Sequence, residues 1–301
     1  MAIDLHAHTT ASDGTLSPRE LVEHARELGL RAVAVSDHDT VGGWPEALSA
    51  GRELGVRVVP AIELSVADEA GNKFHLLGFF PHRTSLDGTE LGEAVGELQR
   101  ERDERNARIY ANLERLGAPV EPARVRQIAG GGAQIGRPHI ARALVERGYA
   151  SSVQDAFDRF LDAKGPAYAS KAGLTPWEAI RLIHEADGVA VWAHPTREPS
   201  ERAAILDFGR GEELIEGWLR WGLDGLETYY GAYTPAEAAW TRAMSERYGL
   251  LGTGGSDFHG ATKPGVFLGQ VNGGETVPDA VLEALESRAR SSAVRRVTSA
   301  E

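Results

Sequence analysis

The chain has 301 residues, of which 42% are hydrophobic and none is cysteine, and its formal net charge is −12 at pH 7. This size suffices for one large packed domain or two smaller ones, and the lack of cysteine excludes disulfides, thiolate metal ligands and cysteine nucleophiles. The acidic charge argues against duplex DNA as a partner, and the absence of a signal-like or ~20-residue apolar run indicates a cytoplasmic protein without a membrane partner.

Seven short apolar runs are predicted to be strands, and most of them are separated by helix-like patterns. They span residues 3–6, 32–36, 56–62, 74–80, 189–193, 225–229 and 250–253. Ser17-Pro18 and Thr175-Pro176 predict helix starts, since each joins a capping residue to a proline at the first helical position. Strands of this kind alternating with helices predict an α/β fold with a parallel sheet, closed or distorted into a barrel.

The regular alternation stops between about residues 98 and 171, where the sequence is helical and charged and carries a glycine run at 130–132. We expect residues 1–98 and 172–290 to form a discontinuous barrel domain. Residues 99–171 would be an inserted helical subdomain that caps the substrate, and the polar residues 291–301 a loose C-terminal tail.

Barrel enzymes carry their chemistry at the carboxyl ends of the strands. His6 and His8 lie two residues apart at the end of the first strand, so their side chains point to the same face and can share a metal ion. Asp13 follows in a short loop. Considered by itself, the His-x-His pair is equally well explained as a surface feature.

Polar side chains of the same kinds occur at other strand ends. A single histidine of this sort would ordinarily be a buried residue satisfied by backbone hydrogen bonds, and Asp37 and Asp39 would ordinarily cap the next helix. Nine candidates nevertheless gather at one rim, whereas His24, His82 and His184 lie elsewhere in the pattern. The nine candidate ligands are His6, His8, Asp13, His38, Glu63, His75, His194, Asp257 and His259.

Nine ligands exceed what one ion can use, so two or three divalent ions are predicted. Imidazole and carboxylate ligands suit Mn²⁺, with Fe²⁺ or Zn²⁺ as alternatives, and one carboxylate must bridge two ions.

The chain resembles the PHP (polymerase and histidinol phosphatase) family. The resemblance covers nearly the whole chain and rests on motifs at residues 6–8, 36–38, 63, 193–195 and 256–259. It implies a distorted (βα)7 TIM-like barrel with a trinuclear metal site at the strand ends. It further implies His6, His8, Glu63 and Asp257 at one ion, Asp13, His38 and His259 at a second, and Glu63, His75 and His194 at a third, with Glu63 as the bridge.

The helical insertion and the Gly136-Arg137-Pro138-His139 motif resemble the branch of this family that removes the 3′-phosphate from nucleoside 3′,5′-bisphosphates, such as pAp to AMP. Some relatives in this branch also trim short RNA from its 5′ end. The resemblance therefore implies a phosphoric monoester hydrolase that acts on a small nucleotide or on short RNA ends. Its nucleophile would be a metal-activated water, because no protein side chain is set apart as one.

A bisphosphate needs a second anion site, and the insertion offers candidates for it. Arg137 is favoured, because Gly136-Arg137-Pro138-His139 places two phosphate-compatible side chains at a predicted helix start. Each of the other candidates could equally be a solvated residue on a helix face. The full set of candidates is Arg102, Arg105, Asn106, Arg137, His139, Lys164, Ser170 and Lys171.

Three other functions stay open. A histidinol phosphatase would share the metal ions but would need an acidic partner for the substrate amine. An amidohydrolase-type enzyme would use one or two ions and often a lysine at a strand end, which this sequence lacks. A non-catalytic, regulatory metal-binding module would be expected to have lost some of the ligands. The sequence predicts no oligomeric state.

Overall fold

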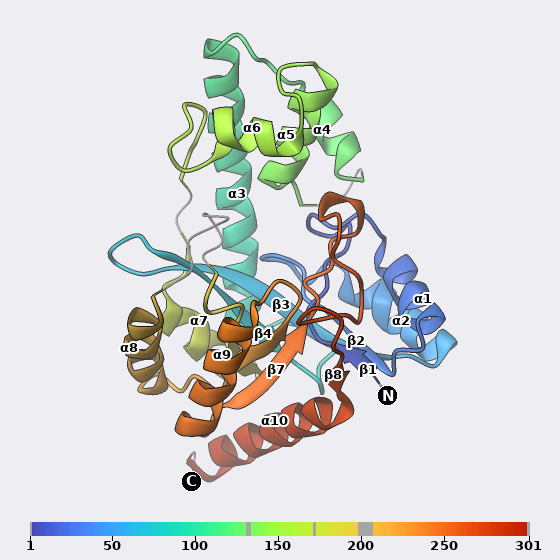
Figure 1. Cartoon of the computed structure of the whole chain (residues 1–301), viewed down its shortest axis with the longest axis vertical. Coiled ribbons are helices and arrows are strands. Elements are labelled where there is room, and N and C mark those ends of the chain that lie inside the picture. The colour runs from blue at the N-terminus through green and yellow to red at the C-terminus, as the bar shows by residue number, and fades with distance from the viewer. Residues whose placement is uncertain (1, 131–133, 171–172, 198–206, 300–301) are drawn as a thin grey trace.

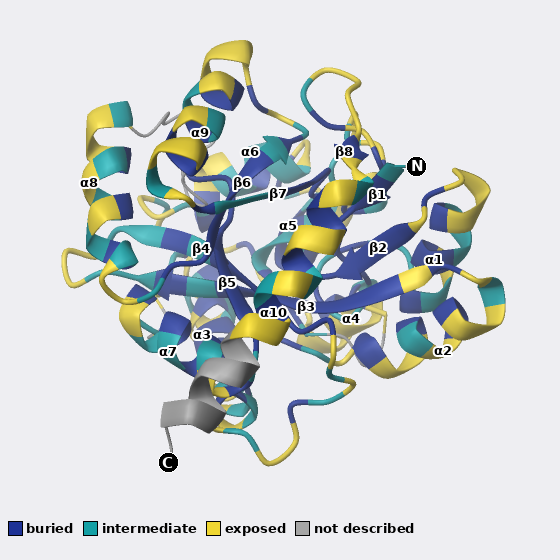
Figure 2. Cartoon of the chain, turned by 90° about the horizontal axis from the view of Figure 1, so that it is seen from below, coloured by how far each residue is buried: buried dark blue, intermediate teal, exposed yellow. Residues whose placement is uncertain are grey.

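An eight-stranded sheet in the order β7-β6-β5-β4-β3-β2-β1-β8 forms the centre of the molecule. The structure is a computed structural model and describes residues 2–130, 134–170, 173–197 and 207–299. In Figure 2 the buried strands lie inside a ring of helices whose outer faces are exposed. The strands are β1 (Ala2–Asp4), β2 (Ala32–Val35), β3 (Arg57–Ala67), β4 (Lys73–Phe79), β5 (Val189–Trp192), β6 (Gly225–Tyr230), β7 (Leu251–Gly255) and β8 (Val277–Pro278).

The sheet curls until β7 lies beside β1. The amide of Leu5 donates to the carbonyl of Gly254 at 3.1 Å, and just beyond the strands Ala7 and Phe258 form a parallel bridge. The result is a nearly closed barrel, which confirms the predicted α/β barrel.

The prediction of a wholly parallel, seven-stranded barrel is wrong in two respects. Strand β4 runs antiparallel to both β3 and β5, and β8 is an additional short strand that pairs with β1. The reversal of β4 has a simple cause. Residues 68–72 are all that joins β3 to β4, whereas a parallel return needs a crossover of a dozen or more residues.

Helices cover the outside of the barrel. The helix starts predicted at Ser17 and Thr175 are both confirmed as capping boxes, in which the side chains of Glu20 and Glu178 bond back to the capping residue's amide. The surrounding helices are α1 (Pro18–Glu27), α2 (Trp44–Leu54), α7 (Pro176–Glu185), α8 (Phe208–Leu219), α9 (Pro235–Tyr248), α10 (Asp279–Ser299) and the 3₁₀ turn η2 (Gly260–Thr262).

A second group of helices stands above the barrel, and the long helix α3 connects the two parts (Figure 1). Leu91 and Leu98 of α3 pack in the barrel core, whereas Ile109 and Leu113 pack in the core of the upper group. The boundary predicted between residues 98 and 99 therefore falls inside one continuous helix. The helices are α3 (Glu90–Arg115), α4 (Pro122–Ile128), α5 (Arg137–Glu146), α6 (Val153–Ala156) and the π-helix η1 (Phe157–Leu161).

The C-terminal segment differs from the prediction of a loose tail from residue 291. Helix α10 continues to Ser299, and residues 300–301 lie outside the described residues. The arginines and alanines of this segment are good helix formers, which accounts for the continuation. None of the described helices is long and apolar enough to cross a membrane.

Candidate active site

One rim of the barrel brings all nine candidate metal ligands together. His6, His8 and Asp13 follow β1, His38 follows β2, His194 follows β5, and Asp257 and His259 follow β7. Glu63 lies within β3, beyond the residues that pair with β2, and forms a bridge with His38. His75 is at the start of β4 instead. Because β4 is antiparallel to its neighbours, its start lies at the same rim as their ends.

The ligand atoms form three groups in which all the atoms lie within 4.8 Å of one another. These groups differ from the division implied by the family resemblance in three respects. His8 and His38 each take part in two groups, Glu63 takes part in only one, and His194 falls outside all three. Which ion each residue holds stays a prediction. The groups are His8, Asp13, His38 and His259; His6, His8 and Asp257; and His38, Glu63 and His75.

Glu63 lies at the centre of these groups and is fully buried. Its Oε1 atom is 2.9 Å from Nδ1 of His75 and 3.1 Å from Nε2 of His194. Its Oε2 atom is 3.2 Å from Nε2 of His8 and 2.9 Å from Nδ1 of His38. Although these last two atoms lie 2.9 Å apart, their orientation does not make a hydrogen bond, and neither Glu63 Oε2 nor His38 Nδ1 has another hydrogen-bond partner among the described residues. Two buried polar atoms left without a hydrogen bond would be satisfied by a cation, so these residues fit a cluster of divalent ions.

The charges of the cluster are strongly coupled. Burial would raise the pKa of Glu63, but His75 and His38 hold that pKa well below its usual range. Burial would lower the pKa of His6, but the carboxylates of Glu227 and Glu63 hold it well above its usual value. Burial dominates at His75 and lowers its pKa to about 4. The metal-free cluster thus contains both ionised carboxylates and protonated imidazoles, as well as the neutral ring of His75.

Glu227 supports the cluster from behind, and it is absent from the residues predicted from sequence. Its Oε1 atom lies 2.9 Å from Nδ1 of His6, and its Oε2 atom accepts the backbone amide of His194 at 2.8 Å. Such partners orient ligand side chains, and here Nε2 of His6 is left facing the cluster. The sequence did contain a signal for this role, because Glu227 is a charged residue in the middle of the buried strand β6.

Asp37 and Asp39 were expected to cap a helix, and this expectation is wrong because the N-cap of α2 is Gly43. Asp37 accepts hydrogen bonds from the Thr9 amide at 2.8 Å and the Ser12 hydroxyl at 2.6 Å. It therefore stabilises the loop that carries Asp13. Asp39 has a left-handed backbone, with φ of 50°, and accepts the amide of Ser65 at 2.8 Å.

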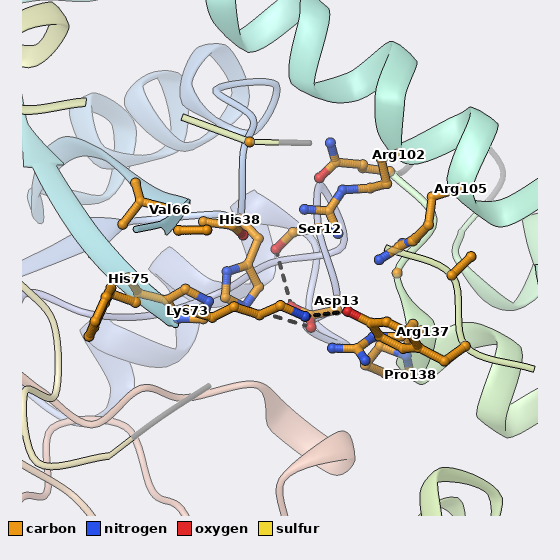
Figure 3. A pocket seen from close by; sticks show the side chains of 18 of the residues that line it. Ser12, Asp13, His38, Val66, Lys73, His75, Arg102, Arg105, Arg137 and Pro138 are labelled. Carbon is orange, nitrogen blue, oxygen red and sulfur yellow. Dashed lines mark hydrogen bonds and ion pairs between the residues drawn. The ribbon is translucent and has the colours of Figure 1, made fainter. Parts of the chain in front are cut away.

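A cavity lies between the barrel rim and the upper helices (Figure 3). Three candidate metal ligands form part of its wall, and four basic side chains also line it. Burial and the guanidinium groups of Arg102 and Arg137 lower the pKa of Arg105 to about 9. The charge of Arg105 is therefore poorly compensated, and the cavity suits an anion. The metal-ligand candidates are Asp13, His38 and His75, and the basic residues are Lys73, Arg102, Arg105 and Arg137.

Comparisons with known proteins agree with this site. Residues 4–116 match the family model described as the PHP domain. A 5′-3′ exoribonuclease of Haemophilus influenzae is 34% identical over 256 residues, which cover 85% of this chain and 89% of that protein. This chain belongs to the PHP family of metal-dependent phosphoesterases. It is therefore a hydrolase.

Two further relatives of this PHP phosphoesterase match it over almost its full length. A 3′,5′-nucleoside bisphosphate phosphatase of Chromobacterium violaceum is 29% identical over 288 residues, covering 95% of this chain and 97% of that one. A crystal structure of a Bifidobacterium adolescentis protein, assigned as a metal-dependent phosphoesterase, superposes with a TM-score of 0.84 at 33% identity. The match covers 95% of this chain and 96% of that one.

Several residues expected to bind substrate lie outside the cavity of this PHP phosphoesterase. Asn106 accepts a hydrogen bond from Arg105 at 2.9 Å and donates to the carbonyl of Ile135. The Nδ1 atom of His139 accepts the amide of Gly136 at 3.0 Å and so caps α5. Lys164 and Ser170 are exposed and do not line the cavity, and Lys171 lies outside the described residues.

Lys73 and Tyr168 line the cavity but were not predicted from sequence. The Lys73 ammonium donates to the Tyr168 hydroxyl, which links β4 to the segment after η1. A signal for Lys73 was present, since it lies two residues before His75 in the same strand and therefore on the same face. Tyr168 lies in an irregular segment, where no periodicity indicates which way a side chain points.

Proposed function

We propose that this PHP phosphoesterase removes the 3′-phosphate from nucleoside 3′,5′-bisphosphates, for example converting pAp to AMP. The proposal is based on one cavity whose wall contains both candidate metal ligands and basic side chains. Candidate metal ligands such as Asp13 and His75 lie in the same cavity as the guanidinium groups of Arg102, Arg105 and Arg137. A substrate with two phosphate groups has one for the ligand cluster and one for the arginines.

The arginines are suited to bind the non-reacting phosphate. Guanidinium groups form paired, charge-assisted hydrogen bonds with phosphate oxygens. Arg102 is held in place by its ion pair with Asp39. Arg137 donates to the carbonyl of Leu161 at 3.1 Å, and its guanidinium lies 5.9 Å from the centre of the Tyr168 ring. These contacts position the donors before a substrate arrives.

The nine candidate ligands would hold two or three divalent ions, for which Mn²⁺ is our preferred assignment. When bound, such ions lower the pKa of a water molecule to about 7 and neutralise charge on phosphoryl oxygens. No protein nucleophile is required. The hydroxyl of Ser12 donates to Asp37 at 2.6 Å and that of Ser65 donates to Asp39 at 3.0 Å, so both serines in the cavity are engaged by carboxylates.

A second candidate function is 5′-3′ exoribonuclease activity on short RNA, which the similarity to the Haemophilus influenzae protein favours. Histidinol phosphatase activity has less support. A substrate amine would need an acidic partner, and Asp13, itself a candidate metal ligand, is the acidic residue among the described residues that line the cavity. A non-catalytic role also has less support, because all nine ligand positions carry competent side chains.

The release of phosphate and of mononucleotides by metal-stripped protein, with and without added Mn²⁺, tests the proposal. The substrates are adenosine 3′,5′-bisphosphate, 5′-AMP, 3′-AMP, histidinol phosphate and a short 5′-phosphorylated RNA. We expect Mn²⁺-dependent turnover that is fastest on the bisphosphate and yields 5′-AMP. Faster turnover of the RNA would favour the nuclease, and a protein that binds Mn²⁺ but hydrolyses none of the substrates would contradict both.

A further inference from the structure

The two oxygens of Asp257 have different surroundings. Oδ1 faces the candidate metal ligands and lies 3.3 Å from Nε2 of His8 and 3.6 Å from Nε2 of His6. Oδ2 points the other way, where it accepts a hydrogen bond from the Tyr230 hydroxyl at 2.6 Å and pairs with the Lys263 ammonium. One oxygen is therefore available to a cation, and the other is already occupied by two donors.

Glu63 differs in this respect. Both of its oxygens face imidazole rings, and within the part of the chain that the structure describes Oε2 makes no hydrogen bond. The two buried carboxylates of the cluster thus differ in how many oxygens are available to cations, since Glu63 offers two and Asp257 offers one.

Tyr230 is placed to hold Asp257 firmly. Its side chain is buried, and the centre of its ring lies 5.3 Å from the centre of the His194 ring and 5.1 Å from that of the Tyr233 ring. Asp257 also has a left-handed backbone, with φ of 58°, a conformation that is uncommon for residues other than glycine. Lys263 is more accessible, with 40% of its side chain exposed.

We propose that Tyr230 and Lys263 are positioning residues that hold Oδ2 of Asp257, so that Asp257 ligates a single ion through Oδ1 while Glu63 bridges. This inference rests on the metal use in the proposed function but not on the identity of the substrate. Partners behind a metal ligand typically contribute about 10–100-fold to metal affinity.

Mn²⁺ titration of the metal-stripped protein tests the role of Tyr230. We expect Tyr230→Phe to lower the affinity for one class of Mn²⁺ ions by about 10–100-fold and to leave the affinity for the others unchanged. Tyr233→Phe is the matched control, because the Tyr233 hydroxyl also lies in this aromatic cluster but donates to the Glu227 carbonyl at 3.1 Å. Equal affinities in the two variants, or equal weakening of every ion in Tyr230→Phe, would overturn the proposal.

Lys263 gives an independent test that does not depend on a buried substitution. Lys263→Gln removes the charge but keeps a donor for Asp257, whereas Lys263→Met removes both. We expect the Met variant to bind the affected ion more weakly than the Gln variant, and identical affinities would refute the role of Lys263.

The two carboxylates can also be compared directly. The Asp257→Asn variant should lose one ion and the Glu63→Gln variant more than one, and equal losses would contradict the assignment of Glu63 as the bridge. Wild-type protein that binds no Mn²⁺ would instead refute the proposed function.

Discussion

At the scale of single residues, His194 connects two parts of the ligand cluster. Its Nε2 atom lies 3.1 Å from Glu63 Oε1 and 3.3 Å from Nδ1 of His75. We expect His194→Ala to lower kcat by more than about 100-fold, since even the partners behind a ligand contribute 10–100-fold. Phosphate release and metal content should fall together. The exposed His82 provides the control, and a similar loss in His82→Ala would show that the effect is not specific to the cluster.

Arg105 should affect substrate binding more than the chemical step. A hydrogen bond to a charged group contributes about 1.5–3 kcal/mol, so we expect Arg105→Gln to raise KM for the bisphosphate by about 10–100-fold. KM for 3′-AMP, which lacks the second phosphate, should change far less. Arg100→Gln on the same helix is the control, because Arg100 is exposed and pairs with Glu97. Equal losses on both substrates would exclude Arg105 from the second phosphate site.

The histidines of the cluster make metal binding depend on pH. The carboxylates around them hold the pKa values of His6, His38 and His194 above the ordinary value, although burial opposes this. Near neutral pH these rings therefore carry protons in the metal-free protein, whereas a metal ligand must be neutral. We expect Mn²⁺ binding to release protons, and its affinity to rise as the pH increases above about 6.5, the ordinary pKa of histidine. Calorimetric titration in two buffers of different ionisation enthalpy measures this release, and a release of zero would contradict the expectation.

At the scale of elements, helix α3 links the arginines to the barrel. Ile109 is fully buried in the core of the upper helices, whereas Leu98 packs in the barrel core. Ile109→Ala should lower the free energy of unfolding by about 2–5 kcal/mol. We expect this loss of packing to loosen the upper helices and to raise KM for the bisphosphate. The Mn²⁺ stoichiometry, measured on the same protein, should not change. Loss of bound metal in this variant would show that the two cores unfold together.

The strand ends were predictable from sequence because polar residues there interrupt apolar runs, and His6 and Glu63 stand out for this reason. The direction of β4 was missed because the predicted strands 56–62 and 74–80 leave residues 63–73 between them, whereas β3 continues to Ala67 and only residues 68–72 join it to β4. The cationic lining was only partly predictable. Arg102 and Arg137 line the cavity, whereas Asn106 bonds to its neighbours, because rotation about the axis of α3 is set by packing that no local pattern records.

At the scale of the whole molecule, the cluster should couple metal binding to stability. It holds several buried ionisable side chains within one small region, and a cation would satisfy those that lack hydrogen bonds. An ion at 100 times its Kd stabilises the fold by about 2.7 kcal/mol, which corresponds to a rise in Tm of roughly 4 °C for a chain of 301 residues. Thermal unfolding of stripped protein with added Mn²⁺ measures this rise. A smaller rise is expected in His194→Ala, and an unchanged wild-type Tm would argue against ion binding.

The bridge between Ala7 and Phe258 also has a consequence for synthesis of the chain. His6 and His8 follow β1, which leaves the ribosome long before β7, whereas Asp257 and His259 follow β7. The ligand groups that contain Asp257 or His259 cannot form until translation has passed β7. A nascent or truncated chain that ends before β7 therefore lacks the complete cluster, and we expect it to have no phosphoesterase activity.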